Sequence, residues 1–229
     1  MIHNYEVRIS ATIARMSASA TLTLAPRALY EQVAELLRQR IFARDMEPGT
    51  WVDEIRIAEE LGISRTPLRE ALKVLAAEGL VTMKVRRGAY VTEVSEQDLR
   101  EVYALLSLLE SDAAGEVARR ARDEELLELQ ALHAELEGAV NERDRFFAIN
   151  EQFHMRLLEI AGNRWRNQVV ADLRKVMKLN RQASLFKAGR VGESLSEHRA
   201  LMEALVARNA PRSVQRMQQH FANGLEAAG

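Results

Sequence analysis

Helix-breaking residues are scarce in this chain, which contains only 4 prolines and 11 glycines among 229 residues. Hydrophobic residues account for 47% of the sequence and charged residues for 28%, a balance that excludes an intrinsically disordered chain. Because the segments between the breaks consist mostly of good helix formers, we expect helix along most of the chain. The sequence therefore predicts a mainly α-helical globular protein of about two modest domains.

The absence of cysteine narrows the chemistry that the chain can support. Disulfide frameworks, thiolate metal sites and cysteine nucleophiles are excluded, and the composition fits a reducing compartment. No apolar run approaches the roughly 18 residues that span a bilayer, and the first 25 residues lack the apolar core of a signal peptide. We expect a cytoplasmic protein with no membrane partner.

The hydrophobic pattern divides the chain into three parts. Residues 1–25 show no sustained period and are predicted to form a mobile N-terminal extension. Residues 26–94 combine short helices with two strand-like runs, 80–85 and 89–94, whereas residues 95–229 keep helical spacing throughout. Breaks split the last part into six helices, of which the five after the first are expected at 123–140, 143–161, 164–186, 193–208 and 211–227. We predict a six-helix antiparallel bundle for it.

Closely spaced helix signals predict a helix-turn-helix in the first domain. Asp53 can cap a short helix that ends at Gly62. A second helix restarts at Ser64 or Thr66, with Pro67 in its first turn, where the missing N–H costs no hydrogen bond. Two helices joined by so tight a turn form a helix-turn-helix unit.

Positive charge is concentrated in this part of the chain. The window 65–87 has six basic and two acidic residues, a net charge of +4, although the whole chain has a net charge of −1. Arg65 and Arg69 lie one turn apart on the second helix, away from its apolar stripe, and Arg86 and Arg87 occupy the tip of the predicted hairpin. A basic helix face alone is usually a solvated surface, but a tight turn, a basic helix and a basic wing in this order indicate DNA binding.

These segments resemble a known class of regulator. The runs Ser64–Leu72, Glu78–Val81 and Arg87–Val91 look like the winged helix-turn-helix of GntR-family bacterial transcription regulators, over about residues 26–94. The resemblance implies binding to double-stranded operator DNA through the second helix and the wing. Some members carry an arginine where this chain has Ile55, and the neighbouring arginine is the nearest substitute. The expected DNA-binding residues are Arg56, Ser64, Arg65, Thr66, Arg69, Arg86, Arg87 and Gly88.

Residues 95–229 resemble the FCD effector domain of the FadR-type branch of that family. The resemblance rests on Phe153-His154, on Glu197-His198-Arg199-Ala200 and on His220. Six helices in this part, rather than seven, are typical of the VanR-like subgroup.

Three histidines of this part share helix faces with apolar residues and are expected to point into the bundle, namely His154, His198 and His220. Gaps of 44 and 22 residues between them form no local ligand motif, so spacing alone favours core histidines. The family resemblance implies instead that they bind a divalent metal ion such as Zn or Ni, with a fourth ligand, usually aspartate, at the position of Asn150.

The asparagine at this fourth position has a consequence for the ligand of the site. Asn150 offers a neutral carbonyl oxygen, so we expect weaker metal retention and a site that an acidic effector completes. Many family members hold the effector carboxylate with an arginine where this chain has Leu106. Arg174 or Arg181 can compensate, although a surface role for each is equally open. The expected effector-binding residues are Asn150, His154, Arg174, Arg181, His198 and His220.

Taken together, these features favour a ligand-responsive transcription regulator that is not an enzyme. We expect a homodimer on a palindromic operator, because helix-turn-helix dimers match two-fold symmetry, and a small organic acid as effector. The alternative is a metal-dependent hydrolase built on the bundle, since three histidines with an open position also describe a catalytic zinc site. Against it, only Glu151 and Glu197 adjoin these histidines in sequence, and each is expected on a different helix face from its neighbour.

Overall fold

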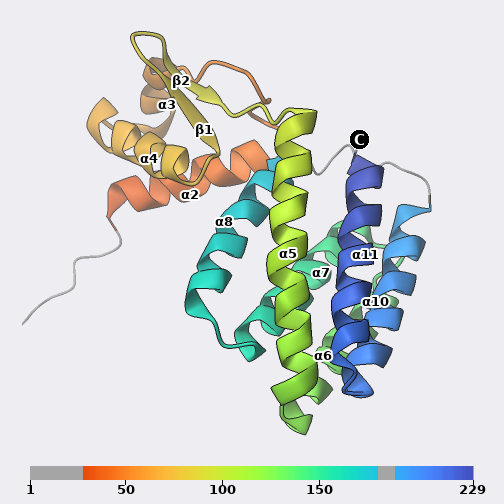
Figure 1. The fold of residues 1–229 in the computed structure, drawn as a ribbon. Helices are drawn as coiled ribbons and strands as arrows, with labels where there is room; N and C mark the ends of the chain where they lie inside the picture. Colours follow the sequence, from red (N-terminus) through yellow and green to blue (C-terminus); the bar gives the residue numbers. More distant parts are fainter. Residues whose placement is uncertain (1–27, 180–188, 229) are drawn as a thin grey trace, which may run out of the picture.

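The computed structural model describes residues 28–179 and 189–228 (Figure 1). The expected extension of residues 1–25 and the candidate Arg181 lie outside the described residues. Within the described part, no helix combines the length and the apolar composition that crossing a membrane requires.

The first domain is a winged helix-turn-helix, as the sequence predicts. It consists of α2 (Leu29–Phe42), α3 (Glu54–Leu61), α4 (Arg65–Ala77), β1 (Val81–Lys84) and β2 (Gly88–Val91). The two strands form an antiparallel hairpin in which Val81 pairs with Val91 and Lys84 with Gly88. The hairpin lies at the free end of the domain, beyond α3 and α4 (Figure 1).

Local signals account for the boundaries of the two central helices. The Asp53 carboxylate accepts the backbone N–H groups of Ile55 and Arg56 at 3.1 and 3.0 Å, which caps α3. Gly62 ends α3 in the left-handed region, at φ +63°, where a Cβ would add strain. Ser64 is the N-cap of α4, but its side chain makes no capping hydrogen bond. Its hydroxyl is thus available for another partner.

The wing is supported by a third short segment. Trp51 forms a bridge with Tyr90, and the Val52 amide donates to the Ala89 carbonyl at 2.9 Å. Gly88 has φ +88°, as expected for the glycine of this turn, and a Cβ there would lie 3.0 Å from the Trp51 indole nitrogen. Both the backbone angle and the indole therefore select glycine at this position.

The described residues of the second part form a bundle of six helices, in agreement with the predicted helical architecture. Its helices are α5 (Glu96–Arg120), α6 (Asp123–Gly138), α7 (Arg143–Ile160), α8 (Arg164–Leu179), α10 (Arg190–Val206) and α11 (Ala210–Ala228). The long α5 begins at a capping box in which Ser95 and Asp98 exchange hydrogen bonds. It packs along α11, while α8 lies between α5 and the first domain (Figure 1).

Two helix boundaries differ from the expected ones. The segment α10 begins at Arg190 rather than at residue 193, because Gly189 takes φ +84° just before it and the Arg190 guanidinium pairs with Glu197 two turns later. This ion pair within α10 spans Gly192, which lies inside the helix despite its low helix propensity. The helix expected at 164–186 is described as α8 up to Leu179.

The apolar interior consists of a core in each part of the molecule. One cluster joins buried side chains of α2, α3, α4 and the hairpin, and a larger one joins the bundle helices around Leu106, Phe153 and Phe221. Leu179, the last residue of α8, belongs to the first cluster although its helix belongs to the bundle. The end of α8 therefore contributes to the core of the first domain.

A glycine in α5 allows the close approach of α11. A Cβ added at Gly115 would lie 2.9 Å from a Val214 methyl group, whereas a Cβ at Gly138, the last residue of α6, would meet nothing within 4 Å. We expect Gly115→Ala to lower the free energy of unfolding by up to about 2 kcal/mol, since overpacking costs about 1–3 and the helix-propensity gain is about 1. Urea denaturation measures the difference.

The control Gly138→Ala is expected to leave the unfolding free energy unchanged or slightly higher. Adding Val214→Ala to Gly115→Ala should recover most of the loss, because the shorter side chain removes the clash. Equal stability of Gly115→Ala and Gly138→Ala would contradict the packing of α5 against α11.

Candidate functional site

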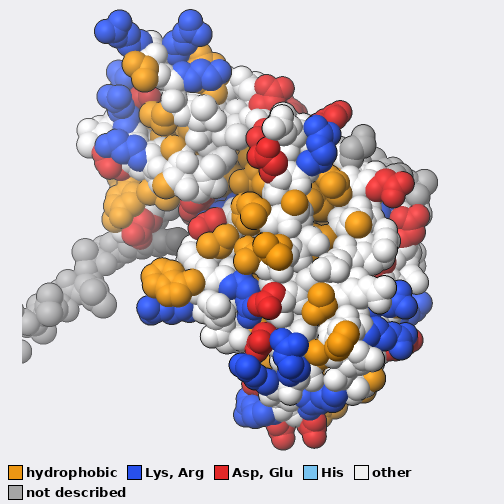
Figure 2. Space-filling model, viewed as in Figure 1, with side chains coloured by type: hydrophobic (Ala, Val, Ile, Leu, Met, Phe, Trp, Pro, Cys, Tyr) orange, Lys and Arg blue, Asp and Glu red, His pale blue; other side chains and the backbone are white. Residues whose placement is uncertain are grey.

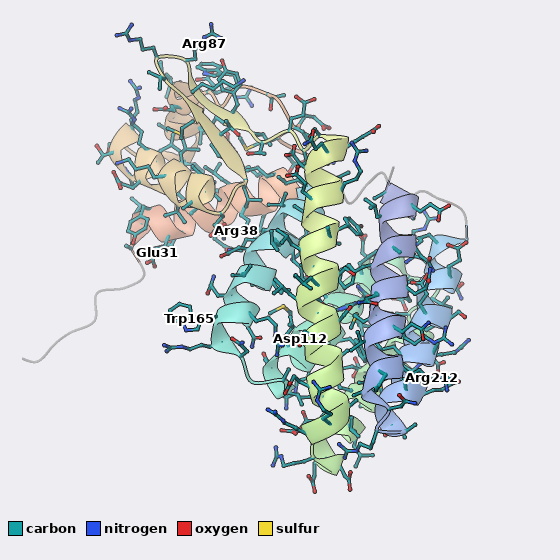
Figure 3. All side chains as sticks on the ribbon, viewed as in Figure 1. Glu31, Arg38, Arg87, Asp112, Trp165 and Arg212 are labelled. Carbon is teal, nitrogen blue, oxygen red and sulfur yellow. The ribbon has the colours of Figure 1, made fainter. Side chains whose placement is uncertain are left out.

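Basic side chains gather at the free end of the first domain. Figure 2 shows Lys and Arg side chains over the hairpin end of this domain, and Figure 3 shows Arg87 projecting from the hairpin away from the body of the protein. On α4, the side chains of Arg65 and Arg69 are 57% and 61% exposed. Both guanidinium groups lie near the Glu54 carboxylate of α3, at 3.4 and 3.7 Å. Glu54 thus holds the two arginines at the start of α4 without burying them.

The other residues expected at this surface are also accessible. Arg56, Ser64, Thr66, Arg86 and Arg87 are exposed, whereas Gly88 is half-buried beneath the Trp51 indole. Arg86 takes φ +61°, so the turn between the strands aims its two arginines outward from consecutive positions. The structure brings together the N-terminus of α4 and a basic wing on one domain.

The three histidines converge inside the bundle from α7, α10 and α11. His154 and His198 are buried, and the His220 side chain is 11% exposed. Their ring centroids are 4.9 to 5.3 Å apart, and one ring nitrogen from each lies within 4.8 Å of the others. The expectation that all three point inward is confirmed.

A buried carboxylate of α5 holds the first of these histidines. Glu110 accepts a 2.6 Å contact from His154 Nδ1 and two hydrogen bonds from the Arg174 guanidinium, at 2.9 and 2.8 Å. Burial raises the pKa of Glu110, and the charge of Arg174 opposes this rise. Burial lowers the pKa of His154 well below its usual value, with the Arg174 charge acting in the same direction. Because the Arg174 guanidinium donates to both Glu110 oxygens, we describe Glu110 as a carboxylate that accepts the Nδ1 proton of His154.

A second carboxylate holds His220 in the same manner. Glu197 of α10 contacts His220 Nδ1 at 2.7 Å, and it also accepts hydrogen bonds from Arg190 at 2.7 Å and from Asn223 at 2.8 Å. Burial alone would raise the pKa of Glu197, but the hydrogen bonds from His220, Arg190 and Asn223 outweigh it and lower the pKa to about 2. Glu197 is therefore an anion at neutral pH.

Four buried polar atoms around the histidines lack a hydrogen-bond partner among the described residues. They are Asn150 Oδ1, His154 Nε2 and both ring nitrogens of His198. The pKa of His198 is also lowered well below its usual value, first by burial and then by the neighbouring His220 and His154. Burying unpaired polar atoms is costly, and neutral imidazole nitrogens are good donors to a divalent cation. These residues fit a metal ion.

A cavity of about 110 Å³ opens beside the histidines, with room for several water-sized groups. Part of its wall is aromatic and includes Tyr103, Phe146, Phe147 and Phe221, and its polar wall includes Asn150, His154, Arg174, Lys178, Arg190 and His220. Each cationic side chain on this wall already contacts a carboxylate: Arg174 pairs with Glu110, Lys178 with Glu151 and Arg190 with Glu197. The polar part of the wall is therefore close to neutral in charge.

The structure decides between the two roles left open for Arg174, and it adds three residues to the surroundings of the histidines. Arg174 is not a surface residue, since it is buried and bound to Glu110. Glu197 was expected on a different helix face from its sequence neighbour His198, and its carboxylate contacts His220 of a neighbouring helix. Glu110 and Arg190 were missed. The only signal for Glu110 was one acidic residue on the apolar face of α5.

The end of α8 connects the cavity with the first domain. Met177 and Lys178 line the cavity, and Leu179 directly follows them in the core of the first domain. The Arg44 guanidinium donates to the Leu179 carbonyl, and the Lys175 ammonium lies 3.7 Å from the Glu78 carboxylate. One turn of helix therefore touches both the cavity and the helix-turn-helix.

The winged helix-turn-helix with its basic surface and the helical second domain indicate a DNA-binding regulator, and comparisons with known proteins agree. Residues 29–91 match the family described as bacterial regulatory proteins, gntR family, and residues 101–223 match the FCD domain. The chain belongs to the GntR family of transcription regulators and carries an FCD domain. The hydrolase alternative is wrong, since the family and its relatives are regulators and not enzymes.

Individual relatives are similar over most of the chain. The transcriptional regulator YdhC of Bacillus subtilis is 28% identical over 204 residues, which cover 88% of this chain and 91% of the relative. The transcriptional repressor RspR of Escherichia coli is 26% identical over 193 residues, 83% of this chain and 85% of the relative. Among solved structures, McbR/YncC of E. coli has a TM-score of 0.73 at 21% identity and covers 89% of this chain and 98% of its own. This last likeness concerns the fold alone.

Proposed function

We propose that this transcription regulator binds a palindromic operator as a homodimer, and that a small carboxylate effector, assisted by a divalent metal ion, controls its DNA affinity. The observation that carries the effector part is the group of three histidines with unpartnered buried nitrogens beside a cavity. The DNA-binding part follows from the family and from the exposed arginines of α4 and the wing.

In the proposed DNA complex, α4 enters the major groove. Arg65 and Arg69 would exchange their exposed contacts with Glu54 for contacts with base edges and phosphates. Ser64 and Thr66 lie at the N-terminus of the helix, where the backbone amides also favour phosphate. Arg86, Arg87 and Gly88 of the wing, and Arg56 of α3, would contact the neighbouring groove or backbone.

The proposed metal site uses His154, His198 and His220, with the Asn150 carbonyl oxygen as a weak fourth ligand. Imidazole nitrogens suit Zn, Ni and similar divalent ions. All four ligands are neutral, and Glu110 and Glu197 are each balanced by an arginine. A bound cation would keep most of its charge and would attract a carboxylate to the cavity.

The effector is proposed to be an organic acid that fits a cavity of about 110 Å³. The arginine and lysine side chains on the cavity wall are paired with carboxylates, so the metal ion would supply the positive charge that the acid needs. Arg174 is proposed to contact the effector while it keeps its bond to Glu110, and Arg181 remains a candidate from the sequence.

Support for a link between effector and DNA comes from α8. An acid in the cavity would contact the turn that carries Met177 and Lys178, and the next residue packs in the core of the first domain. A ligand that prefers one placement of this turn shifts the equilibrium between DNA-competent and DNA-incompetent forms by its difference in affinity for the two.

Support for a homodimer comes from apolar side chains on one face of the bundle. Leu105 and Leu108 of α5 and Trp165 and Val169 of α8 are exposed, and an ion pair between Arg166 and Asp112 joins the two helices between them. Figure 2 shows hydrophobic side chains on this face, and Figure 3 shows Trp165 pointing outward from α8. Exposed apolar groups on adjacent helices suit a second copy of the chain, whose two-fold symmetry matches a palindromic site.

The arginines of α4 are expected to dominate operator binding. Because a base-reading arginine contributes about 1–3 kcal/mol, Arg65→Ala should weaken specific binding about 5- to 150-fold, and Arg69→Ala similarly. Fluorescence anisotropy with an operator fragment measures the change, and Arg100→Ala, an exposed arginine of α5, is the control. If the double variant of Arg65 and Arg69 bound the operator as well as the control does, the assignment of α4 would be wrong.

Asn150→Asp is expected to tighten metal binding at least about tenfold, because it adds a negative charge next to the ion. The same charge is expected to weaken the binding of the organic acid. The measurement is metal content by mass spectrometry together with calorimetric titration of a panel of organic acids. Asn163→Asp is the control, since Asn163 caps α8 and aspartate serves there equally well. Equal metal content and acid affinity in wild type, Asn150→Asp and His198→Ala would mean that the histidines are core residues.

The proposed dimer interface, which includes Leu108, is tested by substituting two leucines of similar exposure. Leu108 of α5 is 65% exposed and Leu127 of α6 is 63% exposed. Leu108→Glu is expected to shift the mass in light scattering from twice the 25.9 kDa of the chain toward the monomer, because it buries a charge in the interface, whereas Leu127→Glu should not. A wild-type mass near 25.9 kDa, unchanged by operator DNA, would overturn the proposed homodimer.

A further inference from the structure

We infer that Glu110 and Glu197 are positioning residues of the histidine centre, each holding Nδ1 of one histidine so that Nε2 is presented to the ion. The inference rests on the proposed metal site and goes beyond it, because it concerns residues that would not touch the metal. It assigns a role to two arginine–glutamate pairs in the bundle, one buried and one partly buried.

The first chain of contacts runs from α8 through α5 to α7. Arg174 fixes both oxygens of Glu110, and one of these oxygens lies 2.6 Å from His154 Nδ1. An ionised carboxylate can only accept, so Nδ1 carries the proton and Nε2 keeps its lone pair. That Nε2 is buried and has no partner among the described residues. Its orientation is therefore set by the carboxylate on the opposite side of the ring.

The second chain of contacts repeats this pattern on α10 and α11. Arg190 donates to both oxygens of Glu197 at 2.7 and 2.9 Å, and Glu197 Oε2 lies 2.7 Å from His220 Nδ1. Asn223, one turn beyond His220 on the same helix, donates to the other oxygen at 2.8 Å. His220 Nε2 is thus the nitrogen left for the centre that it shares with His154.

Structural needs alone do not explain this arrangement. An arginine and a glutamate already satisfy each other, so a stable core gains little from placing a histidine on each pair, least of all His154, whose Nε2 is buried with no partner among the described residues. Hydrogen bonds from metal-bound histidines to carboxylates, in contrast, fix the tautomer and the ring orientation and raise the basicity of the ligand. Neither nitrogen of His198 has such a partner in residues 28–179 and 189–228, where its ring is in contact with the rings of Phe153 and the other histidines.

The experiment compares Zn²⁺ affinity in the full-length protein and in three glutamate-to-glutamine variants. Glu110→Gln and Glu197→Gln each remove a carboxylate that holds a histidine. The control is Glu193→Gln, because Glu193 also lies near Arg190, at 3.5 Å, but is not a partner of the histidines. Calorimetry with a competing chelator should give about 10- to 100-fold weaker Zn²⁺ binding for the first two variants and less than twofold change for the control.

A second measurement needs no metal and no variant. Nitrogen-15 NMR of the metal-free protein distinguishes the two neutral tautomers, and it should find His154 and His220 protonated at Nδ1. This readout keeps the test decisive even if Glu110→Gln, which alters a fully buried group, fails to fold.

A third measurement uses the absorption spectrum of bound Co²⁺. This spectrum should change in Glu197→Gln, because the carboxylate no longer holds the ring of His220.

The outcomes separate this inference from the proposed function. If wild type bound Zn²⁺ and both variants bound it within twofold of the control, the metal site would stand and the positioning role would be overturned. Protonation of His154 and His220 at Nε2 would overturn it as well. If wild type bound neither Zn²⁺ nor Co²⁺, the proposed metal site itself would fail, and the inference with it.

Discussion

The buried carboxylate of Glu110 is the contact on which the arrangement of the bundle interior depends. It is fully enclosed and receives the guanidinium of Arg174 from α8 and Nδ1 of His154 from α7. A carboxylate that loses its partners in such a place costs several kcal/mol, so the three helices have to meet in one relative position. The same contact orients the histidine that faces the cavity. In the proposed function, one side chain thus meets a requirement of folding and a requirement of ligand binding.

Arg174 extends this constraint toward the DNA-binding domain. It lies on α8 five residues before Leu179, which packs into the core of the helix-turn-helix, and the residues between them contact Glu78 and the cavity. A helix is stiff over so short a distance, and packed interfaces tend to switch between discrete arrangements rather than deform gradually. In the proposed mechanism, occupancy of the histidine centre and placement of the first domain are therefore coupled through the last turn of α8, without any change in the recognition helix itself.

Much of the fold was predictable because its signals are local. Asp53, Gly62 and Ser95 act within a few residues of their own positions, and each ends or begins a helix where the sequence predicts. The inward direction of His154 and His198 followed from helical periodicity. The carboxylates that hold the site were not predictable in this way, because Glu110 meets partners 44 and 64 residues away and Glu197 meets a histidine 23 residues away. Nothing in a local pattern distinguishes these glutamates from the many that lie on solvated faces.

The sequence by itself determined the helical fold, the winged helix-turn-helix with its basic face, and the histidines that enter the bundle. It did so because capping, turn formation and helical periodicity depend on neighbours within one or two turns. Only the tertiary structure decided which charges are buried together: that Arg174 and Arg190 are bound to carboxylates, that these carboxylates hold two of the three histidines, and that α8 ends inside the first domain. The pairing of a buried charge depends on which helices pack against each other, and that is a property of the folded chain as a whole.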